Sequence, residues 1–175
     1  NAIHLAYPLM SGFALLGPLA AIGLYEISRR RELGLDSRWT HALDVRHSPA
    51  LPSILLIGAM LVALFLVWLY TAQSIYTSLF GAQPPASIGS FLEDVLTTSR
   101  GWTLIVAGNA AGLVFAIIAL ATTVIAFPLL LDRDVGAVAA IETSARAVLM
   151  NPLPMAAWGV IVALLLVIGS IPLFA

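Results

Sequence analysis

The chain has 175 residues, of which 61% are hydrophobic and only 10% are charged, and its formal net charge is −1. A soluble domain of this composition would precipitate, so the sequence predicts an integral membrane protein. Cysteine is absent, which excludes disulfides, iron–sulfur ligation and thiol catalysis.

Long apolar stretches dominate the chain, and each of them could cross about 30 Å of hydrocarbon as a helix. Aromatic side chains near their ends favour the membrane interface, and these are Trp68, Tyr70, Tyr76, Trp102 and Trp158. The fold class predicted is all-α, a polytopic helical membrane protein with four transmembrane helices. These run approximately over Leu5 to Ile27, Leu51 to Ala72, Trp102 to Phe127 and Leu153 to Phe174.

Two segments between apolar stretches follow the same order, and we call them the elbows. Each has a charged turn that ends in glycine, then a short amphipathic segment, then prolines that start the next apolar stretch. The first elbow runs from Arg29 to Pro52 with its glycine at Gly34, and the second runs from Asp132 to Pro154 with Gly136. This repetition predicts a feature of membrane topology rather than a catalytic motif.

The positions of the arginines predict which side of the membrane the elbows face. Seven of the eight lie in the elbows, and only Arg100 lies in the connection between the second and third stretches. Arginine marks cytoplasmic loops, so both elbows are predicted to be cytoplasmic. The two helical hairpins then share one orientation, as a parallel repeat with halves at about 2–79 and 101–175 of a single membrane domain over 1–175.

Each elbow contains a predicted amphipathic helix that would lie in the membrane interface. In the second elbow Glu142 and Arg146 form an i, i+4 pair opposite an apolar stripe, which consists of Val138, Ile141, Ala145, Val148 and Leu149. In the first elbow the corresponding stripe consists of Leu35, Trp39, Ala42 and Leu43.

The connection on the opposite side of the membrane predicts a turn and a short helix. The turn is Gly81–Pro85, and Ser90 with Glu93 predicts a capping box at the start of the helix. Its apolar residues are spaced for one helical face, so the helix is expected to lie flat on the outer surface.

Chemistry-bearing residues are scarce in the apolar stretches. Glu26 stands at the end of the first one beside Arg29 and Arg30, which predicts an interfacial ion pair rather than a proton relay. Histidines that could hold haem from inside the bundle are lacking, so no cofactor is expected. His41, Asp44 and His47 have spacings of three residues, which leaves a metal site as an alternative to a solvated helix face.

Small residues in the third stretch favour helix packing. Asn109 lies between Gly108 and Gly112, and such residues let helices approach while the amide bonds across them. The alternative is a polar contact to a ligand, lipid head group or pigment. Pro18 predicts a kink in the first stretch. The arginines of the elbows are interpreted first as charges that set topology. The alternative is contact with a partner or anionic lipid, which is then expected of the first elbow, through Arg29, Arg30, Arg31, Arg38 and Arg46.

Two blocks of sequence carry a family resemblance. They are GFALLGPLAAIGLYEISRRRE from Gly12 to Glu32 and FPLLLDRDVGAVAAIETSARAVLMNPLPMAAWG from Phe127 to Gly159. They resemble an uncharacterised domain-of-unknown-function family of predicted bacterial integral membrane proteins, sometimes mislabelled cytochrome c oxidase subunit I. This chain lacks the haem and copper histidines which that label requires. The resemblance implies further spans before and after these blocks, and with ends at Asn1 and Ala175 we expect a fragment of a longer chain.

The sequence predicts a non-enzymatic protein of the bacterial inner membrane. The first hypothesis is an accessory or assembly subunit that packs against a larger membrane complex, in a respiratory or photosynthetic setting, with membrane lipids as further partners and no nucleic acid. The alternative is a transporter or channel-like protein for an apolar or amphiphilic solute, which the repeat favours and the missing coupling charges oppose. The partner, the solute and the oligomeric state stay open.

Overall fold

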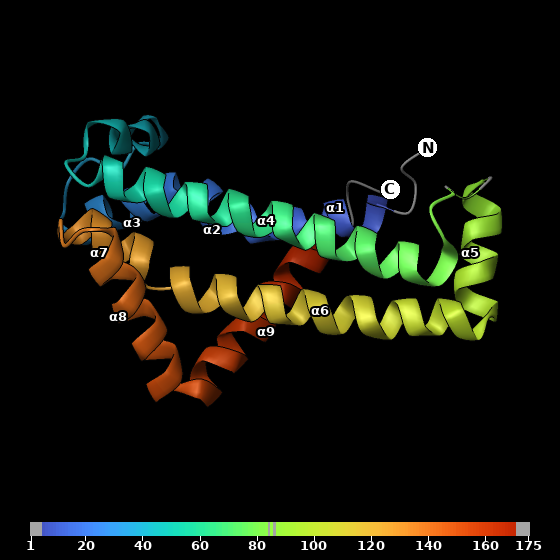
Figure 1. Cartoon of the computed structure of the whole chain (residues 1–175). Helices are drawn as coiled ribbons and strands as arrows, with labels where there is room; N and C mark the ends of the chain where they lie inside the picture. The colour runs from blue at the N-terminus through green and yellow to red at the C-terminus, as the bar shows by residue number, and fades with distance from the viewer. Residues whose placement is uncertain (1–4, 84, 86, 171–175) are drawn as a thin grey trace. The chain divides into compact units, whose positions relative to one another are not determined.

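A computed structural model describes residues 5–83, 85 and 87–170, and all regular structure in this part of the chain is helical. The prediction of an all-α fold is therefore confirmed. The elements in chain order (Figure 1) are α1 (Ala6–Phe13), the 3₁₀ helix η2 (Ala14–Leu16), α2 (Gly17–Ala20), α3 (Ile22–Glu32), the 3₁₀ helix η3 (Trp39–His47), α4 (Leu51–Phe80), α5 (Ile88–Thr97), α6 (Ser99–Thr123), α7 (Ala126–Asp132), α8 (Ala137–Met150) and α9 (Pro152–Ser170).

Two helical segments are long and apolar enough to cross a membrane. They are α4, with 30 residues, and Ser99–Asp132, with 34 residues, which joins α6 to α7. A third span results if α8 and α9, which are bent by 105°, are counted as one. The part of the chain that the structure describes thus has two or three candidate spans, and neither the four predicted spans nor the repeat is shown. The predicted end of the last span at Phe174 lies outside the described residues.

The first predicted span, Leu5 to Ile27, is a series of short helices. The α-helical pattern gives way to 3₁₀ at Ala14–Leu16 and breaks again at Ala21. Pro18 explains the first interruption, because its ring conflicts with the carbonyl of Ala14 and it has no N–H to donate. The predicted kink therefore takes the form of a break in the helix.

The helix α4 is longer than the sequence predicts, since it continues past Ala72 to Phe80. Trp68 then lies within the helix rather than near its end, and its side chain is 3% exposed. Tyr76 is buried as well, while Tyr70 is 75% exposed. Trp68 and Tyr76 thus lie on the buried face of one continuous helix, and Tyr76 stays near its end.

The chain forms two compact units, residues 1–17 with 58–119 and residues 18–57 with 120–175. In the first unit, Trp68 is the central side chain. Its indole N–H donates to the carbonyl of Pro8 at 2.9 Å, and its ring packs on Phe115 at a centroid distance of 5.6 Å. A Cβ on Gly12 would overlap the indole, and a Cβ on Gly112 would lie 3.3 Å from it. Two glycines thus let one large ring fill the space between helices.

In the second unit, α3 packs on α7 and α7 packs on α8. The break between α6 and α7 is built by Pro128, which conflicts with the carbonyl of Val124 and prevents a continuous α-helix. The N–H of Ile125 donates to the hydroxyl of Ser144 on α8 at 3.2 Å, and Ser144 is fully buried. A side chain from another helix therefore satisfies a backbone donor at the break.

Replacing Ser144 with alanine is expected to lower the free energy of unfolding by about 1 to 2 kcal/mol, because the buried Ile125 N–H loses its acceptor. Unfolding in mixed micelles measures this. Thr143→Ala is the matched control, since the Thr143 hydroxyl donates only to a carbonyl of its own helix, that of Ala139. Equal effects of the two substitutions would contradict the role given to Ser144.

The helix α5 begins earlier than the predicted capping box places it. Its N-cap is Ser87, whose hydroxyl accepts from the N–H of Ser90 at 3.1 Å, and the hydroxyl of Ser90 accepts in return from the N–H of Ser87 at 3.2 Å. Ser90 is thus the third residue of the helix and not its cap. Serine takes the place that glutamate or glutamine usually has in this motif, so the pattern with Glu93 was misleading.

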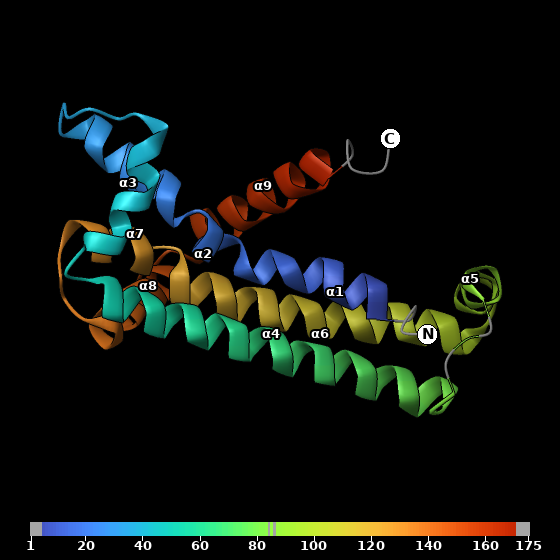
Figure 2. The ribbon, with the colours of Figure 1, turned by 90° about the horizontal axis from the view of Figure 1, so that it is seen from above.

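The two elbows have different structures. Both turns end on glycine in the left-handed region, with φ of +68° at Gly34 and +82° at Gly136, as suits a residue without Cβ. The second elbow then enters α8, which confirms its predicted helix. The first elbow is irregular from Leu35 to Arg38 and forms η3 beside α3 (Figure 2). The amphipathic α-helix predicted there is therefore wrong.

Candidate functional site

A buried carboxylate organises the end of α3. Glu26 is 4% exposed, and its two oxygens accept from Nε and Nη2 of Arg29, each at 2.9 Å. Arg30 Nη1 lies 3.8 Å from the same carboxylate. The spacings i, i+3 and i, i+4 place all three side chains on one helix face. The structure thus confirms the predicted ion pair, and the bidentate geometry is the strong form of this interaction.

Arg30 also joins α3 to the first elbow. Its Nε donates to the carbonyl of Asp36 at 2.8 Å, and its Nη1 donates to the carboxylate of Asp44 at 3.1 Å. These two bonds attach the irregular segment before η3, and η3 itself, to α3.

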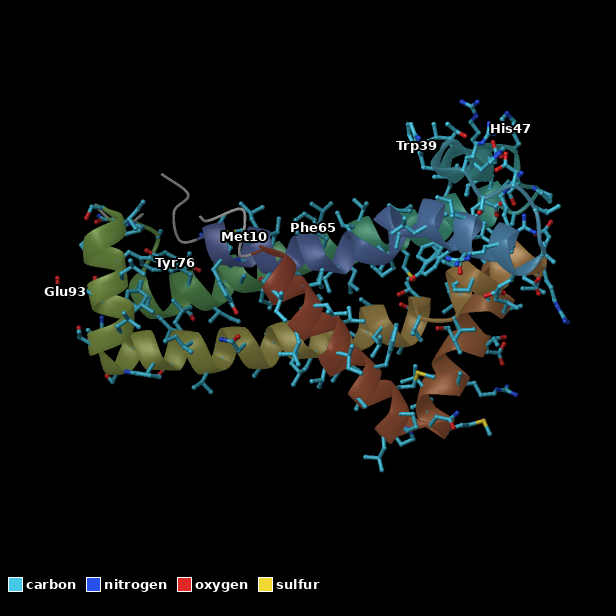
Figure 3. All side chains as sticks on the ribbon, turned by 180° about the vertical axis from the view of Figure 1, so that it is seen from behind. Met10, Trp39, His47, Phe65, Tyr76 and Glu93 are labelled. Atoms are coloured by element: carbon cyan, nitrogen blue, oxygen red, sulfur yellow. The ribbon has the colours of Figure 1, made fainter. Side chains whose placement is uncertain are left out.

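Close backbone packing completes the attachment of η3. The backbone carbonyl of Ala42 lies 3.1 Å from the position a Cβ on Gly23 would occupy, so glycine at this point of α3 gives η3 the room to approach. Figure 3 shows Trp39 and His47 on η3. Three of the four residues of the predicted apolar stripe are exposed, namely Leu35, Trp39 and Leu43.

His41 lies between two carboxylates. Its Nδ1–H donates to Asp44 at 2.6 Å, and its Nε2 is 3.4 Å from a carboxylate oxygen of Asp36. The hydrogen bond from His41, with the nearby charges of Arg30 and His47, lowers the pKa of Asp44. Among the described residues, no three His, Asp or Glu side chains are placed to hold a metal ion. His41 and Asp44 are brought together as a hydrogen-bonded pair and not with His47 as ligands.

Acid is expected to release η3 from α3. The folded-state pKa of Asp44 is depressed, so its contribution to stability is complete above its ordinary pKa of about 3.9 and is lost as the pH falls through the depressed value. Hydrogen–deuterium exchange of the η3 amides, corrected for intrinsic rates, measures the release. His41→Gln removes the main cause of the shift and should move the release to higher pH; an unchanged midpoint would contradict this assignment.

A shallow cavity of about 390 Å³ opens beside this cluster. Charges of both signs line it, with Arg29, Arg30 and Arg133 facing Asp44, Asp132 and Asp134. Because the charges are nearly balanced, the cavity does not select an anion by its field. The arrangement is suited to holding the elbow together and to presenting polar groups at a surface.

The five arginines predicted as contacts divide into two groups. Arg29 and Arg30 are engaged by carboxylates within the chain. Arg38 lies 3.6 Å from Asp36, and both side chains are mostly exposed. Arg31 and Arg46 are exposed, and no described residue forms an ion pair with either of them. Of the five, Arg31, Arg38 and Arg46 thus have exposed side chains that no buried carboxylate engages.

A second polar contact lies in the first unit. The hydroxyl of Tyr7 on α1 donates to Asn109 Oδ1 on α6 at 2.9 Å, and Asn109 Nδ2 donates to the carbonyl of Ile105 at 2.8 Å. Gly112 contacts Trp68, whereas the Cβ position of Gly108 has no atom within 4 Å. The sequence pattern predicts neither the hydrogen bond of Tyr7 nor that of Trp68, although the polar atom of a tyrosine or tryptophan in an apolar helix is itself a signal for a partner.

Comparison with protein families gives one decisive match. Residues 6–132, which are more than half of the chain, match the family described as "Predicted integral membrane protein (DUF2189)". The chain belongs to the DUF2189 family. Comparison with curated proteins gave no match, and comparison with solved structures gave none either.

The DUF2189 match confirms the family that the sequence blocks resemble, and with the helices of Figure 1 it supports a multi-pass integral membrane protein. The matched residues contain the first block and the whole first elbow. They overlap the second block only up to Asp132. The helices α8 and α9 therefore lie outside the part of the chain that defines membership of the family.

Proposed function

We propose that this DUF2189 protein is a non-catalytic accessory or assembly subunit of the bacterial inner membrane, which packs against a larger membrane complex in a respiratory or photosynthetic setting. Both elbows lie on the cytoplasmic side in this proposal, as the arginine distribution favours. The family match supports an integral membrane location, and the lateral role rests on the surface of α6.

The observation that carries the proposal is the open glycine on α6. Gly112 is used within the chain, against Trp68, but the Cβ position of Gly108 one turn away meets nothing within 4 Å. Gly108 is partly exposed, as are Leu104 and Ala111 on the same helix face. Small residues mark the places where membrane helices approach closely, because packing rather than hydrophobicity drives their association. This surface supports contact with another helix.

Substitution at Gly108 tests the proposal. Gly108→Leu has room in the monomer and would block a helix that approaches there, while Ala110→Leu adds a leucine on another face of α6. After gentle solubilisation, native mass analysis should find a complex of fixed stoichiometry with the original chain and with Ala110→Leu, but not with Gly108→Leu. A complex that tolerates both leucines, or a monomer in all three samples, would overturn the proposal.

The transporter alternative predicts a different result in the same experiment. A homo-oligomer that retains an apolar small molecule, together with uptake of that solute into vesicles, would replace the accessory role. Polar contacts at the cytoplasmic side would come from Arg31, Arg38 and Arg46, each contributing about 1 kcal/mol next to an anionic surface. These contacts serve either role and do not decide between them.

A further inference from the structure

Large apolar side chains project from the corner where α8 meets α9. The two helices are bent by 105° there, and Figure 1 shows them meeting as a V. Leu149 is 79% exposed, Met150 is 74% exposed and Leu153 is 82% exposed. An apolar tip of this kind marks an interaction surface. We propose that this corner, residues 147–154, inserts into the hydrocarbon of the bilayer and anchors α8 to the membrane tip first, whether or not the accessory role holds.

The backbone of the corner is largely satisfied from within. The N–H of Asn151 donates to the carbonyls of Ala147 and Val148 at 3.1 and 3.3 Å, and its side-chain amide donates to Ala147 at 3.0 Å. The carbonyl of Asn151 accepts from Met155 at 3.1 Å. Hydrocarbon offers no hydrogen bonds, so a backbone that enters it must satisfy its own polar groups. Water or a polar protein surface would impose no such requirement.

Prolines remove further donors at the same point. A helix start leaves its first N–H groups without acceptors inside the helix, and α9 begins with Pro152 and has a second proline at Pro154. Neither has an N–H to leave unsatisfied. The bend therefore leaves fewer free N–H donors than a helix start without prolines, which a lipid environment favours.

The charges of α8 are directed away from the corner. Arg146 Nη2 donates to Glu142 Oε1 at 3.0 Å, so the guanidinium points back along α8 towards its first turns. No Asp, Glu, Arg or Lys occurs between Arg146 and the last described residue. A long side chain can extend in this way from a buried backbone to the polar interface. The direction of the Arg146 side chain therefore indicates that α8 enters the bilayer at an angle, with Glu142 near the polar surface and the corner deep in the hydrocarbon.

This arrangement differs from a helix that lies flat in the interface. On the predicted apolar stripe, Ile141, Ala145 and Val148 are only partly exposed. Val138 is exposed at the other end of α8. A flat helix would hold Val138 and Leu149 at equal depth, whereas tip-first insertion places Val138 nearer the polar surface. Depth along α8 therefore distinguishes the two arrangements.

Single cysteines can measure this depth, because the chain has none of its own. Met150→Cys, Leu153→Cys, Val138→Cys and Glu142→Cys, each in the whole chain, would carry a small environment-sensitive fluorophore. The proteins are reconstituted in vesicles of phosphatidylethanolamine and phosphatidylglycerol. Quenching is measured with nitroxides attached to the lipid head group or deep in the acyl chain, and with aqueous iodide.

Labels at residues 150 and 153 should lose iodide quenching and respond most strongly to the deep nitroxide, while labels at 138 and 142 should show the reverse order. Equal depth at 138 and 150 would show a flat helix and overturn the proposal. Iodide quenching at both corner positions would also overturn it, since the corner would then lie in water, free for a protein partner. The two independent corner variants guard against misfolding of either one, which circular dichroism would reveal.

Discussion

Replacing Glu26 with glutamine is expected to lower the free energy of unfolding by about 3 kcal/mol, the lower limit of the range for breaking a buried ion pair. Glutamine keeps the shape of the side chain but removes the charge that holds Arg29 through two bonds of 2.9 Å. The effect stays near the lower limit because the Arg29 side chain is 33% exposed. Titration with a denaturing detergent in mixed micelles measures the loss.

The chain contains a matched control for this substitution. Glu142 forms an i, i+4 pair with Arg146 at 3.0 Å, with both side chains about two-thirds exposed. Glu142→Gln makes the same chemical change and should cost no more than about 0.5 kcal/mol, as for other exposed helix pairs. Losses of similar size at residues 26 and 142 would contradict the structural importance given to burial of Glu26.

Replacing Trp68 with alanine is expected to cost about 3 kcal/mol, as for other buried tryptophans. The substitution removes the ring that fills the space beside Gly12 and Gly112, and it removes the donor to the Pro8 carbonyl. Lipid is as apolar as the helix interior, so the loss comes from packing and from the hydrogen bond rather than from hydrophobic burial. The same detergent titration measures it.

Tyr70→Ala is the control for Trp68→Ala, because it truncates an aromatic residue on the same helix that is 75% exposed. Its effect should stay within about 0.5 kcal/mol, as for other exposed positions. Trp68→Phe should fall between the two, since it keeps a ring but not the N–H. Equal losses for Trp68→Ala and Tyr70→Ala would show that the first unit does not depend on this ring.

The features that the sequence predicts well are local ones. The all-helical class follows from long apolar stretches, and glycine at the end of each charged turn agrees with the positive φ of Gly34 and Gly136. The pairing of Glu26 with Arg29 needs only their spacing along one helix. The same holds for Glu142 and Arg146. In each case neighbouring residues contain all the information required.

The features that the sequence does not predict depend on residues far apart in the chain. Arg30 bonds to Asp44, fourteen residues away, and to the carbonyl of Asp36. Trp68 is buried because a glycine on α1 leaves room for its ring. A local sequence pattern identifies such residues only by their type, as aromatic residues of the interface or as surface charges. The sequence therefore predicts which charged residues form the site, but not the hydrogen bonds and ion pairs that join residues far apart in the chain.

The hydrogen bond from Ile125, at the break between α6 and α7, to the hydroxyl of Ser144 on α8 has a consequence for biosynthesis. Ile125 and Ser144 are nineteen residues apart, and the ribosome makes the donor before the acceptor. While α8 is still missing, the Ile125 N–H has no hydroxyl to meet, and the end of the second candidate span lacks this bond. Its final geometry is thus completed only after the next helix has been synthesised, which links the insertion of one span to the arrival of the following segment.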